Sequence, residues 1–386
     1  MIVAGIMSGT SADGINVAIV NLLDHDFATK LDLVAHHEFP YPRNVRKFVL
    51  SVMNAEASVA DLARLNVLLG ELYAEAVLST ASKAQAGVSL IGCHGQTIYH
   101  QGDKKKFLGR EISATWQTGE GAIVAARTGI PVVSDFRQAD MAGGGKGAPL
   151  VPFLDYMMYR HPRRGRIVLN IGGIANMTAI PPGTASSGGT RPERVVAFDS
   201  GPGNMVIDAA MAKLFSKRFD AEGRTAAKGN LIEPVLKKLL AAPYFRQEPP
   251  KTTGREEFGR EFVAKFLKLC EPANKKDVIA TATAFTARSI AQAIHTHLPG
   301  SRHASTYHDL IISGGGSRNC TLVKMICELL PHLTVKTSDA YGIPAEAKEA
   351  VAFAVLAYQT WHRLPGTIPS ATGADYPAVL GKISYP

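Results

Sequence analysis

The sequence lacks the features that mark several special classes of protein. Among 386 residues there are four cysteines, and no two of them form a C-x-x-C pair, which argues against a zinc cluster or a disulfide framework. No apolar run is long enough to cross a bilayer, and the opening residues lack the charged segment of a secretory signal. We therefore expect a cytoplasmic protein that has no membrane partner.

An interleaved stripe of basic and aromatic residues is also missing, although the formal net charge is +9. The lysines and arginines are dispersed, with short clusters at Lys104–Lys106 and Arg163–Arg166. This charge favours anionic partners, and the phosphates of a nucleotide satisfy it as well as a nucleic acid would. We expect no nucleic-acid partner and take the basic clusters as solvated surface.

A strand, a glycine-rich turn and a second strand are predicted twice, over residues 1–20 and again over residues 166–180. Between and after them, strands alternate with helices, an order typical of an α/β fold with a largely parallel sheet covered by helices. Helices are predicted at 58–84, 119–129, 205–242, 256–299, 319–330 and 345–362, strands at 88–95, 130–135 and 309–316, and an irregular excursion at 181–195.

The first glycine turn, GTSADGIN at residues 9–16, has the glycine spacing of a Walker loop. Ile15 and Asn16 stand where that loop needs lysine and a hydroxyl residue, so a Walker loop is excluded. Because a strand follows, the turn is predicted to be a hairpin whose backbone N–H groups and the Thr10 and Ser11 hydroxyls can face a phosphate. An ordinary hairpin turn is the alternative.

Three further glycine clusters each follow an apolar strand: NIGGIAN at 170–176, FDSGPGN at 198–204 and SGGGSRN at 313–319. Glycine lets bare backbone approach a ligand closely, where a side chain would intervene. Turns of this kind in two duplicated lobes are what the actin, hexokinase and heat-shock ATPase superfamily uses to enclose ATP between the lobes.

Nine ordered motifs between residues 7 and 374 resemble the anhydro-N-acetylmuramic acid kinase family. They are MSGTSADG, GCHGQT, RTGIPVVSDFR, GGGKGAPLVP, NIGGIAN, FDSGPGNM, PPKTTGRE, GGGSRN and LPGTIPSATGA. The resemblance implies an α/β fold of two duplicated actin-like (ribonuclease H-like) lobes, each a mixed sheet flanked by helices, with the ATP cleft between them. We expect one lobe at 1–160, completed by 355–386, and the other at 161–354.

The resemblance also implies the reaction. Enzymes of this family use ATP, Mg²⁺ and water to open 1,6-anhydro-N-acetylmuramic acid and phosphorylate its O6, in the recycling of cell-wall sugars. It further implies a small-molecule anhydrosugar as the partner, and a homodimer.

Residues 9–16 match the family's ATP-phosphate loop, and the candidate ATP contacts lie in all four glycine turns. They are Gly9, Thr10, Ser11, Ala12, Asp13, Gly14, Ile15 and Asn16 in the first turn, and Gly172, Gly173, Gly201, Gly203, Gly314, Gly315, Gly316 and Asn319 in the others. Asn16 is a departure, because the family usually has aspartate there; asparagine keeps an acceptor oxygen but loses the charge.

By resemblance, Asp199 matches the family's catalytic base, and a carboxylate beside a glycine-rich phosphate turn can take a proton from an attacking water. Glu349 matches a glutamate that faces the cleft, and we expect it to help Asp199 hold Mg²⁺ or water. The alternatives are a turn-forming role for Asp199 and a solvated helix face for Glu349.

His94, Gln96 and Arg137 are candidate contacts to the sugar, and a core histidine bonded to backbone is the competing interpretation of His94. Residues 251–256, KTTGRE, either bound the sugar pocket or cap the following helix through Thr252 or Thr253.

Two other functions are weighed against this one. PPKTTGRE and AKEA are also similar to segments of the levoglucosan kinases, so another anhydrosugar is the first alternative; the short chain and the LPGTIPSATGA tail favour the muramic sugar. The second is an ATP-binding chaperone or filament module, which would need an additional segment that is not seen.

Overall fold

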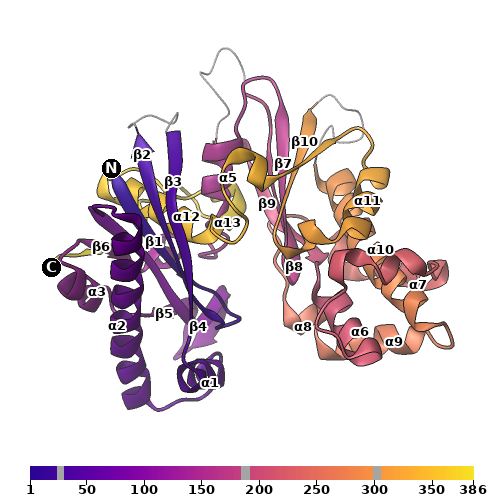
Figure 1. Cartoon of the computed structure of the whole chain (residues 1–386), viewed down its shortest axis with the longest axis horizontal. Coiled ribbons are helices and arrows are strands. Elements are labelled where there is room, and N and C mark those ends of the chain that lie inside the picture. Colours follow the sequence, from indigo (N-terminus) through magenta and orange to yellow (C-terminus); the bar gives the residue numbers. More distant parts are fainter. Residues whose placement is uncertain (24–29, 184–191, 299–305) are drawn as a thin grey trace. The chain divides into compact units, whose positions relative to one another are not determined.

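The structure is a computed structural model that describes residues 1–23, 30–183, 192–298 and 306–386. The chain divides into two compact units (Figure 1), one formed by Met1–Met157 with Gly342–Pro386 and the other by Met158–Tyr341. The segment that returns to the first unit begins at Gly342, earlier than the expected residue 355. The reason is that helix α12 (Lys348–Trp361) packs along its length on the sheet of the first unit.

The sheet of the first unit begins with three consecutive antiparallel strands, followed by a strand that returns parallel to the first. These are β1 (Ile2–Ser8), β2 (Gly14–Leu23), β3 (Lys30–Pro40) and β4 (Leu90–Phe107). A fifth strand, β6 (Val132–Ser134), lies parallel to β4. The strand order is β12-β6-β4-β1-β2-β3, with β5 (Arg110–Thr118) paired to β4 and β12 (Lys382–Ser384) at one edge.

The second unit repeats this plan. Its strands β7 (Gly165–Ile171), β8 (Ile174–Ile180) and β9 (Val196–Pro202) are consecutive and antiparallel. β10 (Tyr307–Ser313) lies parallel to β7, and β11 (Thr334–Thr337) lies parallel to β10. In both units the core strands therefore follow the order 3-2-1-4-5 with the same directions, which confirms the predicted duplication of ribonuclease H-like lobes.

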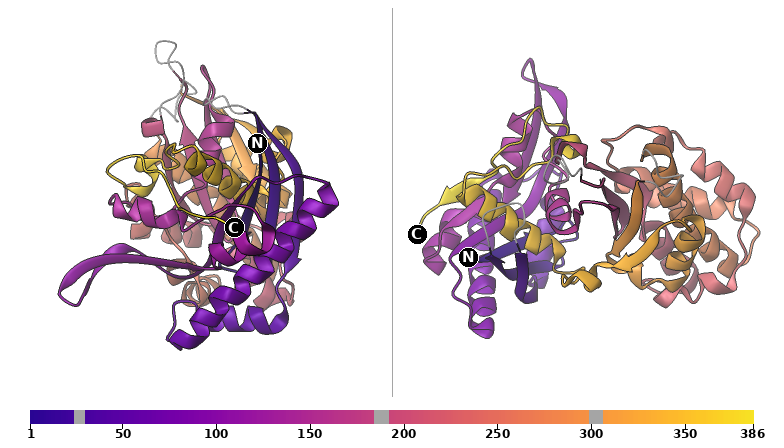
Figure 2. Two further views of the ribbon diagram at one scale, coloured as in Figure 1. Left: turned by 90° about the vertical axis from the view of Figure 1, so that its left-hand side faces the viewer. Right: turned by 90° about the horizontal axis from the view of Figure 1, so that it is seen from above.

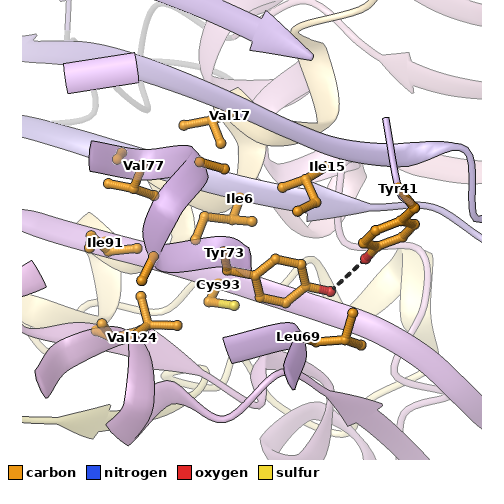
Figure 3. Packing of buried hydrophobic residues seen from close by; sticks show 14 of the residues in the cluster. Ile6, Ile15, Val17, Tyr41, Leu69, Tyr73, Val77, Ile91, Cys93 and Val124 are labelled. Atoms are coloured by element: carbon orange, nitrogen blue, oxygen red, sulfur yellow. Dashed lines mark hydrogen bonds between the residues drawn. The ribbon is translucent and has the colours of Figure 1, made fainter. Parts of the chain in front are cut away.

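One face of the first sheet is covered by α2 (Val59–Ala84), a helix that the apolar period predicted. Alternate residues of the strands, Ile6 on β1 and Ile15 on β2, pack with Leu69 and Tyr73 of α2 in one buried cluster (Figure 3). The hydroxyl of Tyr73 is satisfied inside this core by the hydroxyl of Tyr41, 3.1 Å away. The cluster fixes β1 and β2, and with them the turn that joins the two strands.

The opposite face of the first sheet carries α12. Gly5 of β1 and Gly92 of β4 lie against its backbone, and a Cβ at either position would overlap the carbonyl of Ala350 or of Phe353. The two glycines therefore allow a close approach of helix to sheet that no other residue permits.

The remaining helices differ in part from the prediction. In the first unit they are α1 (Arg43–Val52), α3 (Gly121–Thr128), α4 (Phe136–Ala142), α5 (Pro152–Tyr159) and α13 (Pro369–Thr372). In the second they are α6 (Met205–Phe215), α7 (Glu233–Leu240), α8 (Arg255–Phe258), α9 (Arg260–Leu269), α10 (Lys275–His297) and α11 (Cys320–Leu329). The predicted helix at 205–242 is wrong over its centre, where short 3₁₀ turns at Ala221–Gly223 and Ala226–Lys228 separate α6 from α7.

Strands β4 and β5 continue as a hairpin that projects from the first unit (Figure 2), and its tip exposes Phe107 and Leu108. Most of the irregular excursion predicted at 181–195 lies outside the described residues. Within the described part of the chain, no helix combines the length and apolarity needed to span a membrane.

We predict that Gly5→Ala destabilises the protein by about 3 kcal/mol or more, because the added methyl group meets helix backbone that cannot move aside. Gly87→Ala is the matched control, since a Cβ at that position meets nothing within 4 Å. Thermal melting of both variants measures the effect, and equal melting temperatures would show that α12 does not pack on β1 in this way.

Candidate active site

The first glycine turn is a hairpin between β1 and β2, closed by the Ala12 N–H donating to the Gly9 carbonyl at 3.0 Å. Ser8 and Gln96 hold it in place. The Ser8 hydroxyl donates to Gln96 Oε1 at 2.6 Å, and Gln96 Nε2 donates to the Gly9 carbonyl at 3.1 Å. Gln96 has no exposed surface, so its side-chain amide fixes the hairpin from the buried side. Its predicted contact to the sugar stays a prediction.

A cavity of about 590 Å³ lies against this hairpin. Its lining includes backbone of Gly9 and Gly14 together with oxygen-bearing side chains: Asp13, Asn16, Glu38, Glu346 and Glu349. Strand pairing explains part of the set, because Glu38 of β3 is the register partner of Asn16 of β2. Sequence reasoning missed Glu38 and Glu346, since neither belongs to a glycine motif.

Asn16 is held by a histidine. His36 Nε2 donates to Asn16 Oδ1 at 3.0 Å. Burial lowers the pKa of His36, while the carboxylates of Glu38 and Glu346 raise it. The asparagine thus has a structural partner in the hairpin without the negative charge that aspartate would bring.

His94 and Arg137, two of the residues predicted to contact the sugar, are hydrogen-bonded to each other; the contact to the sugar stays a prediction. Arg137 donates to His94 Nε2 from Nε at 3.1 Å and from Nη2 at 2.8 Å, and its Nη1 donates to the Gly147 carbonyl at 2.7 Å. His94 Nδ1 lies 2.7 Å from the Gly95 carbonyl, so Nδ1 carries the proton and Nε2 accepts. Burial and the Arg137 charge hold the pKa of His94 well below its usual range, which keeps the ring neutral.

Glu349, in the first turn of α12, belongs to the same unit and acts on this pair through its charge. Burial lowers the pKa of Arg137 to about 10, and the Glu349 carboxylate opposes that effect. Glu349 lines the hairpin cavity and keeps some surface exposed to solvent. Desolvation raises the pKa of its carboxyl group, and the positive charges of Arg137 and Lys348 lower it. The first unit thus gathers the hairpin, the His94–Arg137 pair and Glu349.

The three glycine turns of the second unit meet at one end of its sheet. The Gly203 N–H donates to the Gly173 carbonyl at 2.9 Å, and the Asn204 N–H donates to the Gly172 carbonyl at 2.8 Å. Gly316 lies so close to Ile171 that a Cβ would overlap that side chain. The turns at 172–173, 201–203 and 314–316 therefore form one cluster, in which Gly173 and Gly315 are exposed and Gly201, Gly203 and Gly316 are buried.

Beside this cluster is a second cavity of about 300 Å³. Gly315 and Asn319, both predicted for ATP, line it. Asn319 also caps α11, because its Oδ1 accepts from the Leu322 N–H at 3.0 Å. The rest of the lining was not predicted: Asn204 and Arg318 lie within the glycine motifs but were not singled out, and the remaining residues lie outside the motifs, namely Ile207, Asp208, Phe219, Asp220 and Glu222.

Asp199 lies on β9 directly before the 201–203 turn, and three hydrogen bonds fix it. Its N–H donates to the Lys251 carbonyl at 3.0 Å, and its carbonyl accepts from the Tyr244 hydroxyl at 2.7 Å. Its carboxylate oxygen Oδ2 accepts from the Thr253 N–H at 2.8 Å. Burial raises the pKa of Asp199 to about 6, with the Thr253 N–H and the Lys251 charge acting against that rise. A carboxylate tuned in this direction can serve as a base near neutral pH.

The 251–256 segment therefore contacts the candidate base directly. The capping alternative for Thr252 and Thr253 is wrong, because α8 begins after Gly254 and has no side-chain cap.

In the described part of the chain, no three His, Cys, Asp or Glu side chains are grouped closely enough to hold a metal ion by themselves. Asp199 and Glu349, expected to share Mg²⁺, lie in different units. The oxygen ligands around the hairpin cavity nevertheless fit Mg²⁺, which binds proteins through one or two carboxylates and completes its shell with water and substrate phosphates.

Comparison with known proteins decides the family. The model of the anhydro-N-acetylmuramic acid kinase family matches residues 1–386, the entire sequence. The chain belongs to the anhydro-N-acetylmuramic acid kinase family. The relative from Caldanaerobacter subterraneus subsp. tengcongensis is 42% identical over 394 residues, covering 99% of this chain and 96% of the relative. One from Bacillus cereus is 41% identical over 392 residues, covering 100% of this chain and 99% of the relative. Both carry the family's name.

Among solved structures, xylulose kinase from Rhodospirillum rubrum is similar with a TM-score of 0.46 and 12% identity, over 93% of this chain and 90% of that one. The assignment of the fold rests on the repeated strand order rather than on this likeness. For the anhydro-N-acetylmuramic acid kinase family, the match extends over all four glycine turns and both candidate carboxylates.

Asp199 makes the stability of the protein depend on pH in a definite direction. Its pKa is raised from 3.8 to about 6, so the folded state disfavours its ionised form. The group's contribution to stability is therefore lost as the pH rises from about 4 through 6. We predict that Asp199→Asn melts higher than the wild type by about 3 °C or more at pH 7. The difference should shrink towards pH 4 in melting curves; a lower melting temperature at pH 7 would contradict the burial of this carboxylate.

Proposed function

We propose that this protein is an anhydro-N-acetylmuramic acid kinase. The observation that carries the proposal is the full-length match to that family, together with a candidate base, Asp199, beside a cluster of glycine turns. The reaction consumes 1,6-anhydro-N-acetylmuramic acid, ATP and water, and yields N-acetylmuramic acid 6-phosphate and ADP. It belongs to the recycling of cell-wall sugars, in the cytoplasm, and a homodimer is part of the proposal.

In this reaction Asp199 takes a proton from the water that attacks C1 of the sugar. The bond between C1 and O6 breaks, and O6 takes the γ-phosphoryl group as ADP leaves. Two features support this role for Asp199. The Thr253 N–H holds one carboxylate oxygen, and the raised pKa of about 6 leaves the group ionised at neutral pH yet basic enough to accept a proton.

We assign the phosphates of ATP to the glycine turns. In the first unit, the hairpin at residues 9–16 presents backbone and the Thr10 and Ser11 hydroxyls. In the second, the turns at 172–173 and 314–316 expose the backbone of Gly173 and Gly315, the 201–203 turn packs behind them, and the cavity at Gly315 and Asn319 is the candidate site for the rest of the nucleotide. Backbone donors of this kind stabilise the charge that develops on a transferring phosphoryl group.

The acidic lining of the hairpin cavity supports Mg²⁺ as the cofactor, because Glu38, Glu346 and Glu349 would repel ATP without a cation between them. Glu349 is our candidate ligand in this unit and Asp199 in the other. When bound, Mg²⁺ neutralises charge on the β- and γ-phosphates.

His94 and Arg137 are proposed as the sugar contacts. The hydrogen bonds from Arg137 to the neutral His94 ring, and from Arg137 to the Gly147 carbonyl, fix the guanidinium, so a substrate meets an ordered cationic donor beside a neutral imidazole.

Incubation of the purified protein with ATP and either anhydrosugar tests the substrate. We expect ADP release and a sugar 6-phosphate with 1,6-anhydro-N-acetylmuramic acid, and at most weak turnover of levoglucosan, which lacks the lactyl and N-acetyl groups. Turnover of levoglucosan alone would overturn the proposal in favour of another anhydrosugar kinase.

Asp199→Asn should lower kcat by roughly a hundredfold or more, as expected for loss of a general base, while ATP affinity stays nearly unchanged. Steady-state kinetics together with calorimetric titration of ATP measure both quantities. Loss of ATP binding along with turnover would instead assign Asp199 the turn-forming role.

A further inference from the structure

Lys251 is a buried cation for which the proposed reaction has so far no use. Only 5% of its surface is exposed. Its ammonium donates to the Tyr244 carbonyl at 3.2 Å and lies 3.4 Å from His297 Nε2. The Tyr244 ring centroid is 4.8 Å away and that of Phe198 is 5.8 Å away. A buried charge is costly unless it is partnered, so this enclosure of two rings, a carbonyl and an imidazole is a specific site for an ammonium group.

The histidine in this enclosure, His297, is oriented so that its Nε2 can accept a hydrogen bond from the Lys251 ammonium. His297 Nδ1 lies 3.4 Å from a carboxylate oxygen of Glu248, which leaves Nε2 facing Lys251. The ring also packs edge-on against Phe198, with centroids 5.4 Å apart. Glu248, His297 and Lys251 thus form a chain that runs from the surface into the core behind β9.

The same residues hold Asp199. The backbone carbonyl of Lys251 accepts from the Asp199 N–H, and two residues later the Thr253 N–H donates to Asp199 Oδ2. Tyr244 links the two residues. Its hydroxyl donates to the Asp199 carbonyl, and its backbone carbonyl accepts from the Lys251 ammonium. Lys251 therefore joins the two elements that fix the candidate base.

The side chains around Thr253 supply no other anchor in the described structure. The Thr253 hydroxyl is buried and makes no hydrogen bond to a described residue, and Gly254 that follows has no side chain. Thr252 is exposed. The position of the Thr253 N–H relative to the carboxylate thus depends on how firmly Lys251 is held.

We propose that Lys251 is a positioning residue that anchors residues 251–253 from its aromatic enclosure and so aims the Asp199 carboxylate. This rests on the proposed role of Asp199 as the base. The residue acts through the backbone of its own segment, without contact to the reacting atoms.

Hydrogen–deuterium exchange of the free, full-length protein tests the anchor directly, because the amides of Asp199 and Thr253 are the donors in question. Lys251→Met fits the apolar enclosure but removes the donor, and Lys251→Gln is a second variant that keeps a shorter neutral donor in case the first does not fold. We expect exchange at both amides to be roughly tenfold faster in Lys251→Met. Lys265→Met, an exposed site on α9, is the matched control and should leave both amides protected. Unchanged protection in the Lys251 variants would overturn the proposal.

Kinetics then separate positioning from a general structural role. We expect kcat to fall by roughly tenfold in Lys251→Met, the KM for ATP to stay within about twofold, and Lys251→Arg to recover much of the loss. Faster exchange with an unchanged kcat would show that the anchor does not serve the reaction. A wild-type protein that does not phosphorylate the anhydrosugar would refute the proposed function, while the exchange data would still decide whether Lys251 anchors the segment.

Discussion

The close packing of α12 on the first sheet is the contact on which the first unit depends. Gly5 and Gly92 admit the helix backbone to within contact of β1 and β4, and the helix then carries Glu349 to the hairpin cavity. Its neighbour Lys348 forms a buried ion pair with Asp155 of α5, at 2.6 Å. A segment from near the end of the chain is thereby built into the unit formed by its beginning. Through this contact the Glu349 carboxylate also comes near enough to Arg137 to act on its pKa.

The second unit has the same strand order as the first, and it also holds a glycine turn in place, but with different groups. In both units a glycine turn joins the first two strands, and the turn is fixed by groups from elsewhere in the chain. Gln96 of β4 braces the turn in the first unit, and backbone of residues 203–205 braces the turn at Gly172 and Gly173 in the second. The proposed binding of phosphate needs backbone N–H groups at fixed positions, and these hydrogen bonds supply the rigidity that glycine alone lacks.

The two units differ in the chemistry that they offer. The first has an acidic cavity beside its hairpin, which suits a cation, whereas the second has the buried carboxylate of Asp199, which accepts from the Thr253 N–H and lies near the buried Lys251. A base that must accept a proton benefits from partial burial, since desolvation raises its pKa. This division agrees with the proposed roles, in which Asp199 serves the hydrolysis of the bridge and the acidic cavity holds the cation for phosphoryl transfer.

Much of this architecture could be predicted from local pattern. The apolar runs before each glycine turn mark β1, β7, β9 and β10, and the 3.6-residue period marks α2. β3 and β5 were missed, because their side chains are mostly exposed or half-buried and leave no apolar run. The helix predicted over 205–242 is broken where the chain turns at Glu222 and Gly223, whose φ angles are +55° and +71°.

The site residues could be predicted from the sequence only where they belong to a recognisable motif. FDSGPGN led to Asp199 by resemblance, and the geometry then supplied a buried carboxylate with a backbone donor. The contact of Gln96 with Gly9, and that of Lys251 with Tyr244 and His297, join residues that no local pattern links. Such contacts arise from strand pairing and core packing, so they became visible only in the folded chain.

We propose that one protein couples opening of the anhydro bridge by water to transfer of phosphate to O6. Turnover of 1,6-anhydro-N-acetylmuramic acid and ATP in water enriched in ¹⁸O, followed by mass spectrometry of the products, tests this coupling. We expect one ¹⁸O atom at C1 of the sugar 6-phosphate and none in the phosphoryl group. Release of labelled inorganic phosphate with the sugar left intact would contradict it.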